Sequence, residues 1–227
     1  NNKSFYKVLD NLLGKSHKKL LEELNLEGKQ EVMAFQTHSA NVFVIDENIP
    51  IEAIKRQINK CLKGEVKVLE VEEVEKDFNA RFDAKNRTYL YIMRNEEDIT
   101  PFEANYMTGL KTSVNVEKFQ EIMNDFVGKY DFSSFMKKDK AYRNPVREIV
   151  YIKCYYDAKN GKKQLNVEIC GNGFLKTMVR IMIGSALAVY FGNVEEDYIK
   201  KRLENPNADD KKILAASEGL YLYKVNY

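Results

Sequence analysis

The sequence predicts an α+β protein built from two units, each an antiparallel sheet backed by helices. From residue 87 onward, the apolar patterns follow the order β-α-β-β-α-β. An Asn160-Gly161 pair between two strand-like runs favours a hairpin. The first third follows α, β, α, β, and we expect it to be the same pattern with its opening strands either lost or not recognisable in the sequence. We therefore expect one α+β subdomain over residues 1–79 and a β-α-β-β-α-β subdomain over residues 80–227.

The N-terminal third is expected to contain helices and strands in alternation. Apolar residues recur at helical spacing over 4–13, and a more charged helix is expected over 15–24. A strand is expected over 40–46, and Pro50 opens the helix IEAIKRQINKCL. The run VKVLEVEEV at 66–74 is typical of a further strand.

The larger C-terminal part has clearer patterns. A strand over 87–93 places Arg87, Tyr89, Tyr91 and Met93 on one face. The elements that follow are a helix ended by a glycine, two hairpin strands, an apolar helix and a final strand. They are expected over 116–128, 147–157, 163–170, 173–191 and 220–227.

The composition excludes several classes of catalytic site. The chain has 227 residues, a net charge of +2 and two histidines, and its three cysteines form no CxxC pair. Zinc sites and Ser-His-Asp or Cys-His catalysis therefore lack their usual groups. An enzyme of this composition is expected to use carboxylates, tyrosines and arginine, without a metal.

The same features indicate where the protein works. The odd number of widely spaced cysteines favours a reduced, cytoplasmic compartment. The longest nearly uncharged run, 181–193, is too short to span a bilayer, and no N-terminal segment resembles a secretory signal. We therefore expect no membrane partner, while the mildly basic charge neither requires nor excludes a nucleic acid.

Arg180 is the most informative single residue. It lies within the apolar run GFLKTMVRIMIGSALAVYF, where an ionised side chain needs a partner because burying an unpaired charge is costly. At helical spacing it shares a stripe with Lys176, Thr177 and Gly184. The pattern allows this stripe to face either solvent or a cleft.

Two other features also have alternative interpretations. The segment 131–147 interleaves five cations with phenylalanine and tyrosine, which suits RNA phosphates and unpaired bases. The same composition is typical of a solvated, mobile loop. Tyr89 and Tyr91 either line a cleft or belong to the core, because tyrosine alternation is ordinary in strands.

Five blocks of the sequence resemble the tRNA pseudouridine synthase A family. In order they are DFNARFDAKNRTYLYIM, FVGKYDFSSF, NPVREIVYI, GNGFLKTMVRIMIGS and EGLYLYKVNY. The match covers most of the chain from about residue 40 onward, and its ordered blocks make it specific. It implies two ferredoxin-like, RRM-like units that form a pseudo-two-fold antiparallel sheet, with helices on one face and a central cleft.

The resemblance also implies a chemistry. The family isomerises uridine to pseudouridine in the tRNA anticodon stem-loop without a cofactor, using one essential aspartate. Counting back without gaps from Asn48-Ile49-Pro50 places Glu31 at the position of this aspartate. Arg180 then corresponds to the arginine that pairs with the catalytic carboxylate, and Tyr89 to the tyrosine that lies against the target base.

Other residues are expected to bind RNA: Lys29, Arg81, Lys137, Lys138, Arg143, Arg147 and Lys176. The family is usually a homodimer with tRNA crossing both subunits, so tRNA and a second copy of the chain are the expected partners. Around Glu31 the sequence departs from the family pattern, with Lys29 in place of arginine and with unrelated residues at Val32, Met33 and Phe35. Two hypotheses follow, namely an active synthase or a catalytically impaired relative that binds tRNA.

Overall fold

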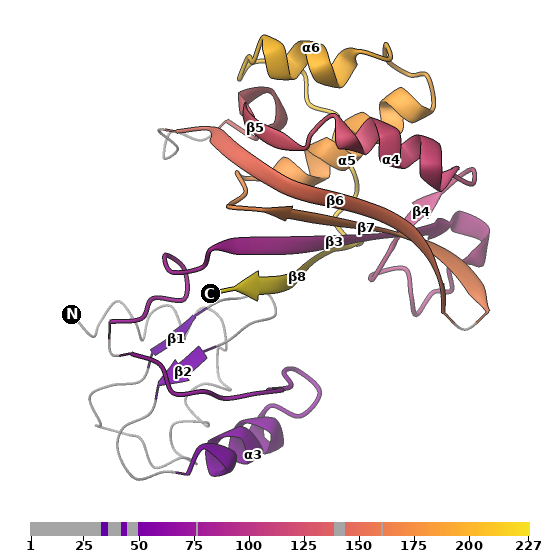
Figure 1. Cartoon of the computed structure of the whole chain (residues 1–227). Coiled ribbons are helices and arrows are strands. Elements are labelled where there is room, and N and C mark those ends of the chain that lie inside the picture. Colours follow the sequence, from indigo (N-terminus) through magenta and orange to yellow (C-terminus); the bar gives the residue numbers. More distant parts are fainter. Residues whose placement is uncertain (1–32, 36–41, 45–49, 76, 139–143, 160) are drawn as a thin grey trace. The chain divides into compact units, whose positions relative to one another are not determined.

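The computed structural model describes residues 33–35, 42–44, 50–75, 77–138, 144–159 and 161–227 (Figure 1). The chain divides into two compact units, one containing the residues up to Ala84 together with Tyr227, the other residues 85–226. The predicted α+β class is confirmed, since helices accompany a mostly antiparallel sheet. The pseudo-two-fold relation, the central cleft and the boundary after residue 79 stay predictions.

The first unit contains a two-stranded antiparallel sheet and one helix among its described residues. Their bounds are β1, Met33–Phe35; β2, Val42–Val44; and α3, Ile51–Cys61. Ile54, Ile58 and Leu62 are buried at the spacing of an amphipathic helix. The strand predicted within 40–46 and the helix predicted after Pro50 are confirmed.

The strand predicted over 66–74 is wrong, because these residues form no strand with any described segment. Val68 instead has both of its backbone groups bonded to one side chain. The Asn59 amide donates to the Val68 carbonyl at 2.9 Å, and the Asn59 side-chain oxygen accepts from the Val68 N–H at 2.6 Å. A side chain here takes the place of a neighbouring strand. The helices predicted over 4–13 and 15–24 lie outside the described residues.

The second unit is organised around a six-stranded sheet (Figure 1). The strand order is β4-β3-β7-β6-β5, and β8 also pairs with β3. The bounds are β3, Asn86–Asn95; β4, Thr108–Leu110; β5, Gly128–Asp131; β6, Val146–Lys159; β7, Lys162–Gly171; and β8, Leu220–Asn226. Among the described strands of this sheet, only β3 and β4 pair in parallel. β3 has β7 along one edge, while β8 and then β4 share the other edge.

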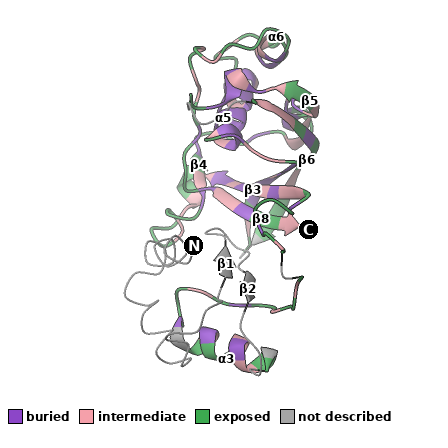
Figure 2. Cartoon of the chain, turned by 90° about the vertical axis from the view of Figure 1, so that its left-hand side faces the viewer, coloured by how far each residue is buried: buried purple, intermediate pink, exposed green. Residues whose placement is uncertain are grey.

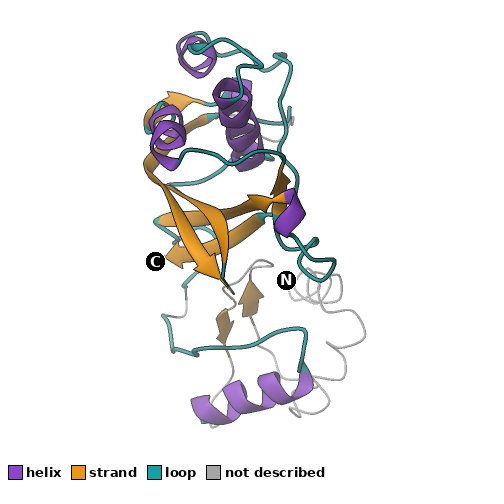
Figure 3. Cartoon of the chain, turned by 90° about the vertical axis from the view of Figure 1, so that its right-hand side faces the viewer, coloured by secondary structure: helices purple, strands orange, loops and turns teal. Residues whose placement is uncertain are grey.

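Helices cover one face of this sheet. In Figures 1 and 3, α4 and α5 lie over the strands, and α6 lies beyond α5. The helical segments are η1, Glu96–Asp98; α4, Val116–Asn124; η2, Ser133–Phe135; α5, Met178–Tyr190; and α6, Tyr198–Glu204. This is the arrangement expected when each strand buries alternate side chains against helices.

Both long helices of the second unit are shorter than the sequence predicts. α5 begins at Met178 and not at residue 173, because Thr177 has a φ of 66°, a left-handed conformation that a helix cannot include. α4 ends at Asn124, and Gly128, expected to end it, begins β5 with a φ of 128°. The residues before Met178 therefore form a loop over the sheet.

The core of the second unit lies between the sheet and the helices. Tyr91 and Met93 of β3 alternate into it, as do Val167 and Ile169 of β7. α5 is buried along most of its length, as its purple colour in Figure 2 indicates. An apolar helix of this kind is stabilised by contacts on all its sides. A charged side chain on it therefore needs hydrogen-bonding or ionic partners.

Candidate active site

Tyr89 lies in the middle of β3, with β7 and β8 on its two sides. The register of the β8 pairing shifts at Tyr89, an irregularity that redirects side chains locally. The Tyr89 ring packs edge-to-face on Phe174, with centroids 5.0 Å apart and planes at 80°. Because Phe174 belongs to the loop 171–177, that loop is held over the first half of β3, and half-buried Tyr89 lies at its edge.

Tyr91 belongs to the core. It is fully buried, and its hydroxyl is 2.8 Å from both the Thr108 Oγ1 and the Ala216 carbonyl oxygen. Burial raises the pKa of the Tyr91 phenol, and nearby Arg180 and Glu218 act on it in opposite directions. Of the two tyrosines, only Tyr89 has the exposure that contact with a ligand requires.

Arg180 lies in the first turn of α5 and is half-buried. Its Nε donates to the Ala215 carbonyl at 2.9 Å, and its own carbonyl accepts from the Ala215 N–H at 3.0 Å. Among the described residues, no carboxylate lies within 4.0 Å of its guanidinium. Glu31, the predicted partner, lies outside the described residues, so their ion pair stays a prediction.

The helical stripe predicted to contain Arg180 is wrong in part. Lys176 and Thr177 precede α5 and therefore do not share a helical face with Arg180. Gly184 is on the helix, where a Cβ would lie 2.5 Å from the Ile213 carbonyl oxygen. The glycine thus allows another segment of backbone to approach α5, and its side of the helix does not face solvent.

Three of the predicted RNA-binding residues gather at the loop 171–177. The Lys137 N–H donates to the Lys176 carbonyl at 3.0 Å. Arg147 lies beside Gly173, where a Cβ would be 3.6 Å from the Arg147 Nε. Three basic residues therefore lie on or beside the loop that carries Phe174, which is a suitable setting for a phosphate backbone.

Arg87 joins this group, although sequence reasoning did not assign it to RNA binding. Its Nη1 donates to the Asn172 carbonyl at 3.1 Å, which ties β3 to the loop 171–177. A signal was present in the sequence, because Arg87 precedes Tyr89 by two residues and so shares its face of the strand.

The other predicted RNA-binding residues do not join this group. Lys138 pairs with Asp209 at 2.7 Å, and both side chains are exposed. Arg81 belongs to the first unit, where its guanidinium lies 5.5 Å from the centre of the Phe82 ring. Lys29 and Arg143 lie outside the described residues.

The prediction that aromatic residues of 131–147 stack on RNA bases is wrong for two of them. Phe132 and Phe135 are fully buried, with ring centroids 6.3 Å apart, and Phe135 also packs on Phe126 at 5.0 Å. These rings anchor the segment to the core, because burying an aromatic side chain is strongly favourable. Its cations remain the groups that suit a nucleic acid.

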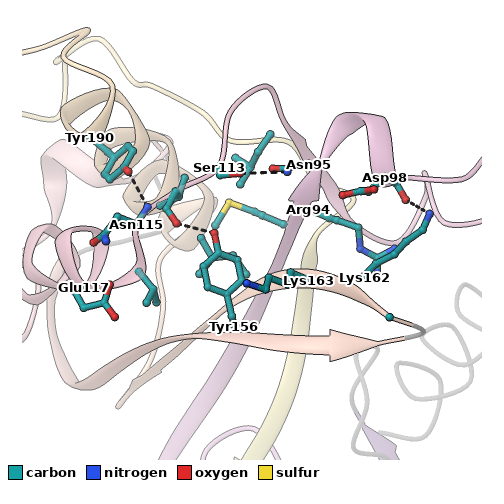
Figure 4. Close-up of a pocket in the computed structure, with 16 residues that line it drawn as sticks. Arg94, Asn95, Asp98, Ser113, Asn115, Glu117, Tyr156, Lys162, Lys163 and Tyr190 are labelled. Carbon is teal, nitrogen blue, oxygen red and sulfur yellow. Dashed lines mark hydrogen bonds between the residues drawn. The ribbon is translucent and has the colours of Figure 1, made fainter.

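A hollow of about 770 Å³ lies at the C-terminal end of β3, where Arg94 and Asn95 line it (Figure 4). Polar groups that line it bond one another. The Tyr156 hydroxyl donates to the Val114 carbonyl at 2.6 Å, and the Lys162 Nζ donates to the Asp98 carbonyl at 2.6 Å. These bonds hold the β6–β7 hairpin against the rest of the unit. We therefore interpret the hollow as a structural feature of this end of the sheet and not as a ligand site.

Within the described part of the chain, no group of three or more His, Cys, Asp or Glu side chains is placed to hold a metal ion. Cys154 and Cys170 are free thiols, and burial raises the pKa of Cys154 to about 12, so it is not a reactive thiolate. None of the described helices is long and apolar enough to cross a membrane.

Comparison with known proteins gives consistent matches. A family model described as tRNA pseudouridine synthase matches residues 122–227. A tRNA pseudouridine synthase A 2 of Bacillus cereus is 32% identical over 185 residues, which are 82% of this chain and 74% of the relative. A tRNA pseudouridine synthase A of a Thermoanaerobacter species is 30% identical over 225 residues, covering 97% of this chain and 90% of the relative. One from Limosilactobacillus fermentum is 35% identical, covering 82% of this chain and 71% of the relative.

Proposed function

Because this chain belongs to the tRNA pseudouridine synthase A family, we propose that it isomerises uridine to pseudouridine in the tRNA anticodon stem-loop. The observation that carries the proposal is the position of Arg180. It is a half-buried arginine in the first turn of an apolar helix, held by a carbonyl, with no carboxylate partner in the described part of the chain. A charge so placed is suited to meet a catalytic carboxylate or the substrate.

The reaction moves a bond without adding or removing atoms. The bond between ribose C1′ and uracil N1 breaks, the base turns, and a bond forms between C1′ and C5. The C5 proton is then lost, and N1 is left carrying a proton. Because the conversion is redox-neutral and adds no atoms, it needs no oxidant, reductant or group donor, and the residues of the chain have to bind and orient the nucleotide, supply the attacking carboxylate and transfer protons. The target nucleotide must leave its stack to reach them.

Three residues are proposed to carry the chemistry. The Glu31 carboxylate attacks the sugar or the base. Arg180 pairs with this carboxylate and keeps it ionised, since a neighbouring positive charge lowers the pKa of an acid. Its Nε is already bonded to Ala215, which leaves the two terminal nitrogens for a bidentate contact. Tyr89, half-buried beside Phe174, lies against the base and moves the C5 proton.

The basic group around the loop 171–177 is proposed to hold the phosphates beside the displaced nucleotide. Lys137, Arg147, Lys176 and Arg87 are the described members of this group. Cations of this kind give affinity that falls steeply with salt. We propose that the working form is a homodimer that binds one tRNA across both subunits.

The second candidate is a catalytically impaired relative that binds tRNA without modifying it. The feature that favours it is Glu31, because counting back without gaps from Asn48-Ile49-Pro50 places this glutamate at the position of the family's aspartate. The extra methylene moves the carboxylate by about an ångström, and misplacement on that scale can cost about 100-fold in rate.

A pseudouridine assay on transcribed, unmodified tRNA separates the two candidates. We expect metal-free turnover by the native chain, loss of turnover in Glu31→Ala, and equal or higher turnover in Glu31→Asp. The Glu31→Ala protein should still bind tRNA in a salt-dependent way, which shows that the variant is folded. A folded native chain that leaves every uridine intact at high enzyme concentration contradicts the proposal and favours the binding protein.

A further inference from the structure

Residues 213–219, called here the strap, return to α5 from a distant part of the sequence. The strap approaches the helix at Gly184, where a Cβ would lie 2.5 Å from the Ile213 carbonyl oxygen and 2.8 Å from the Ala215 nitrogen. Two hydrogen bonds then join Ala215 to Arg180, one to its Nε and one from the Ala215 N–H to its carbonyl. The orientation of the Arg180 guanidinium therefore depends on where the strap lies.

The strap is fixed on its other side by β3 and β4. The Tyr91 hydroxyl reaches the Ala216 carbonyl at 2.8 Å and the Thr108 Oγ1 at 2.8 Å. A carbonyl only accepts, so the single phenolic proton goes to Ala216, and the Thr108 hydroxyl donates to the phenol oxygen. At the end of the strap, the Gly219 carbonyl accepts from the Ile92 N–H at 2.9 Å.

Burial of its own side chains does little to hold the strap. Leu214 is 51% exposed, and Ala216, Ser217 and Glu218 are also exposed, while Ala215 is buried. Polar bonds and close backbone contacts must therefore fix its position, since little apolar area is removed from water. In the described part of the chain, Tyr91 is the only residue of the sheet whose side chain donates a hydrogen bond to the strap.

We propose that Tyr91 is a positioning residue for Arg180. Its phenol holds the Ala215–Ala216 segment in place, and the Ala215 carbonyl in the same segment fixes the orientation of the Arg180 guanidinium. The catalytic part of this inference rests on the proposed function. Arg180 is the group that contacts the reacting partners, and Tyr91 acts only through it.

The Tyr91→Phe variant tests the inference, because it removes one hydroxyl and keeps the ring in the core. We expect the kcat for pseudouridine formation to fall about 10- to 100-fold, as for a misplacement of about an ångström. The KM for tRNA should stay within about twofold, because the basic loop is untouched. Tyr155→Phe is the matched control, since Tyr155 also donates a 2.7 Å hydrogen bond, to Glu168, from the opposite face of the sheet.

The position of Arg180 is measured directly by NMR on protein labelled with ¹⁵N-arginine. The Arg180 Nε–H signal, assigned by its absence in Arg180→Lys, is expected to exchange slowly in the native chain and in Tyr155→Phe. In Tyr91→Phe it should shift and exchange faster.

An unchanged Arg180 Nε–H signal in Tyr91→Phe overturns the inference, whether or not the chain is active. A changed signal with an unchanged kcat overturns its catalytic part. A native chain without turnover contradicts the proposed function instead, and the NMR measurement then still decides whether Tyr91 positions Arg180.

Discussion

Two arginines of the second unit are held in contrasting ways. Arg94, near the end of β3, has a side chain that is only 1% exposed, and it is closed off by two side chains. Its Nη1 donates to Glu103 at 2.7 Å and its Nη2 to Gln164 at 3.2 Å. Arg180 is half-buried and bonded through Nε to a carbonyl, with no acidic partner in the described ranges.

The difference separates a charge that is neutralised within the fold from the charge that we propose to act in the reaction. The Arg94–Glu103 bond is the main reason that the pKa of Glu103 falls from 4.5 to about 2, with bonds from Thr100 contributing. Arg94 therefore neutralises the Glu103 carboxylate within the fold. Both of its terminal nitrogens are already bonded, so neither is available to a ligand. Arg180 has one bond that sets its direction, and its two terminal nitrogens suit the bidentate contact with a carboxylate that we propose.

Replacing Arg180 by lysine tests the proposed role of this arginine, and it has the largest expected effect on turnover. Lysine keeps the charge but loses the Nε–H and the planar fork. We expect turnover to fall about 100- to 1000-fold, as when one preorganised donor is removed from an active site. The melting temperature should change little, because Arg180 is not fully buried. Turnover that stays near the native rate in a folded Arg180→Lys protein contradicts the functional assignment.

Gly184→Ala tests whether the close packing of the strap against α5 is needed for stability and turnover. The new Cβ would meet strap backbone at 2.5 and 2.8 Å, so the strap has to move. We expect a loss of about 1–3 kcal/mol in the free energy of unfolding, measured by urea denaturation, together with lower turnover per folded molecule. The adjacent Ser185→Ala is the control. It removes a buried hydroxyl that has no bond within the described residues, and it should be neutral or stabilising.

Glu103→Gln tests the structural arginine through pH. Because the folded-state pKa of Glu103 lies below its ordinary value, its ionised form stabilises the fold above about pH 4.5, and this stabilisation is lost as the pH falls toward 2. The variant should therefore unfold at lower urea than the native chain at pH 7, and the gap should narrow between pH 4.5 and 2. Exposed Glu97→Gln should show no such gap. If Glu103→Gln and the native chain have equal denaturation midpoints at pH 7, the Arg94–Glu103 ion pair does not contribute to the stability of the fold.

Lys176→Gln tests whether the surroundings of Arg180 bind phosphate, and it has the smallest expected effect. We expect tRNA affinity to fall a few-fold and the slope of log K against log salt to decrease by about 1. Lys138→Gln should change binding less, because Lys138 already pairs with Asp209. Filter binding across a salt series measures both variants, and a larger loss with Lys138→Gln would shift the proposed RNA contact away from the loop 171–177.

Local sequence pattern was enough for a large part of the fold. The strand containing Tyr89, the hairpin at Asn160-Gly161 and the apolar helix around Arg180 follow from spacing between near neighbours. These elements are determined locally because side-chain periodicity directly reflects backbone geometry. The family motifs lie on the same elements, so the sequence alone is enough to propose Tyr89 and Arg180 as site residues.

Only the tertiary structure decided which groups meet those residues. The acceptor for Arg180 lies 35 residues away, on a strap without a helical or strand pattern, and the Gln164 partner of Arg94 lies 70 residues away. Val68 is bonded to a side chain in place of a strand. Periodicity indicates which face of an element is buried, but it carries no information on which distant segment returns to cover that face. The sequence by itself therefore identified Arg180 as a charge that needs a partner. The long-range return of the chain decided that Arg94 is closed off by Glu103 and Gln164 within the fold, while Arg180 has no acidic partner among the described residues.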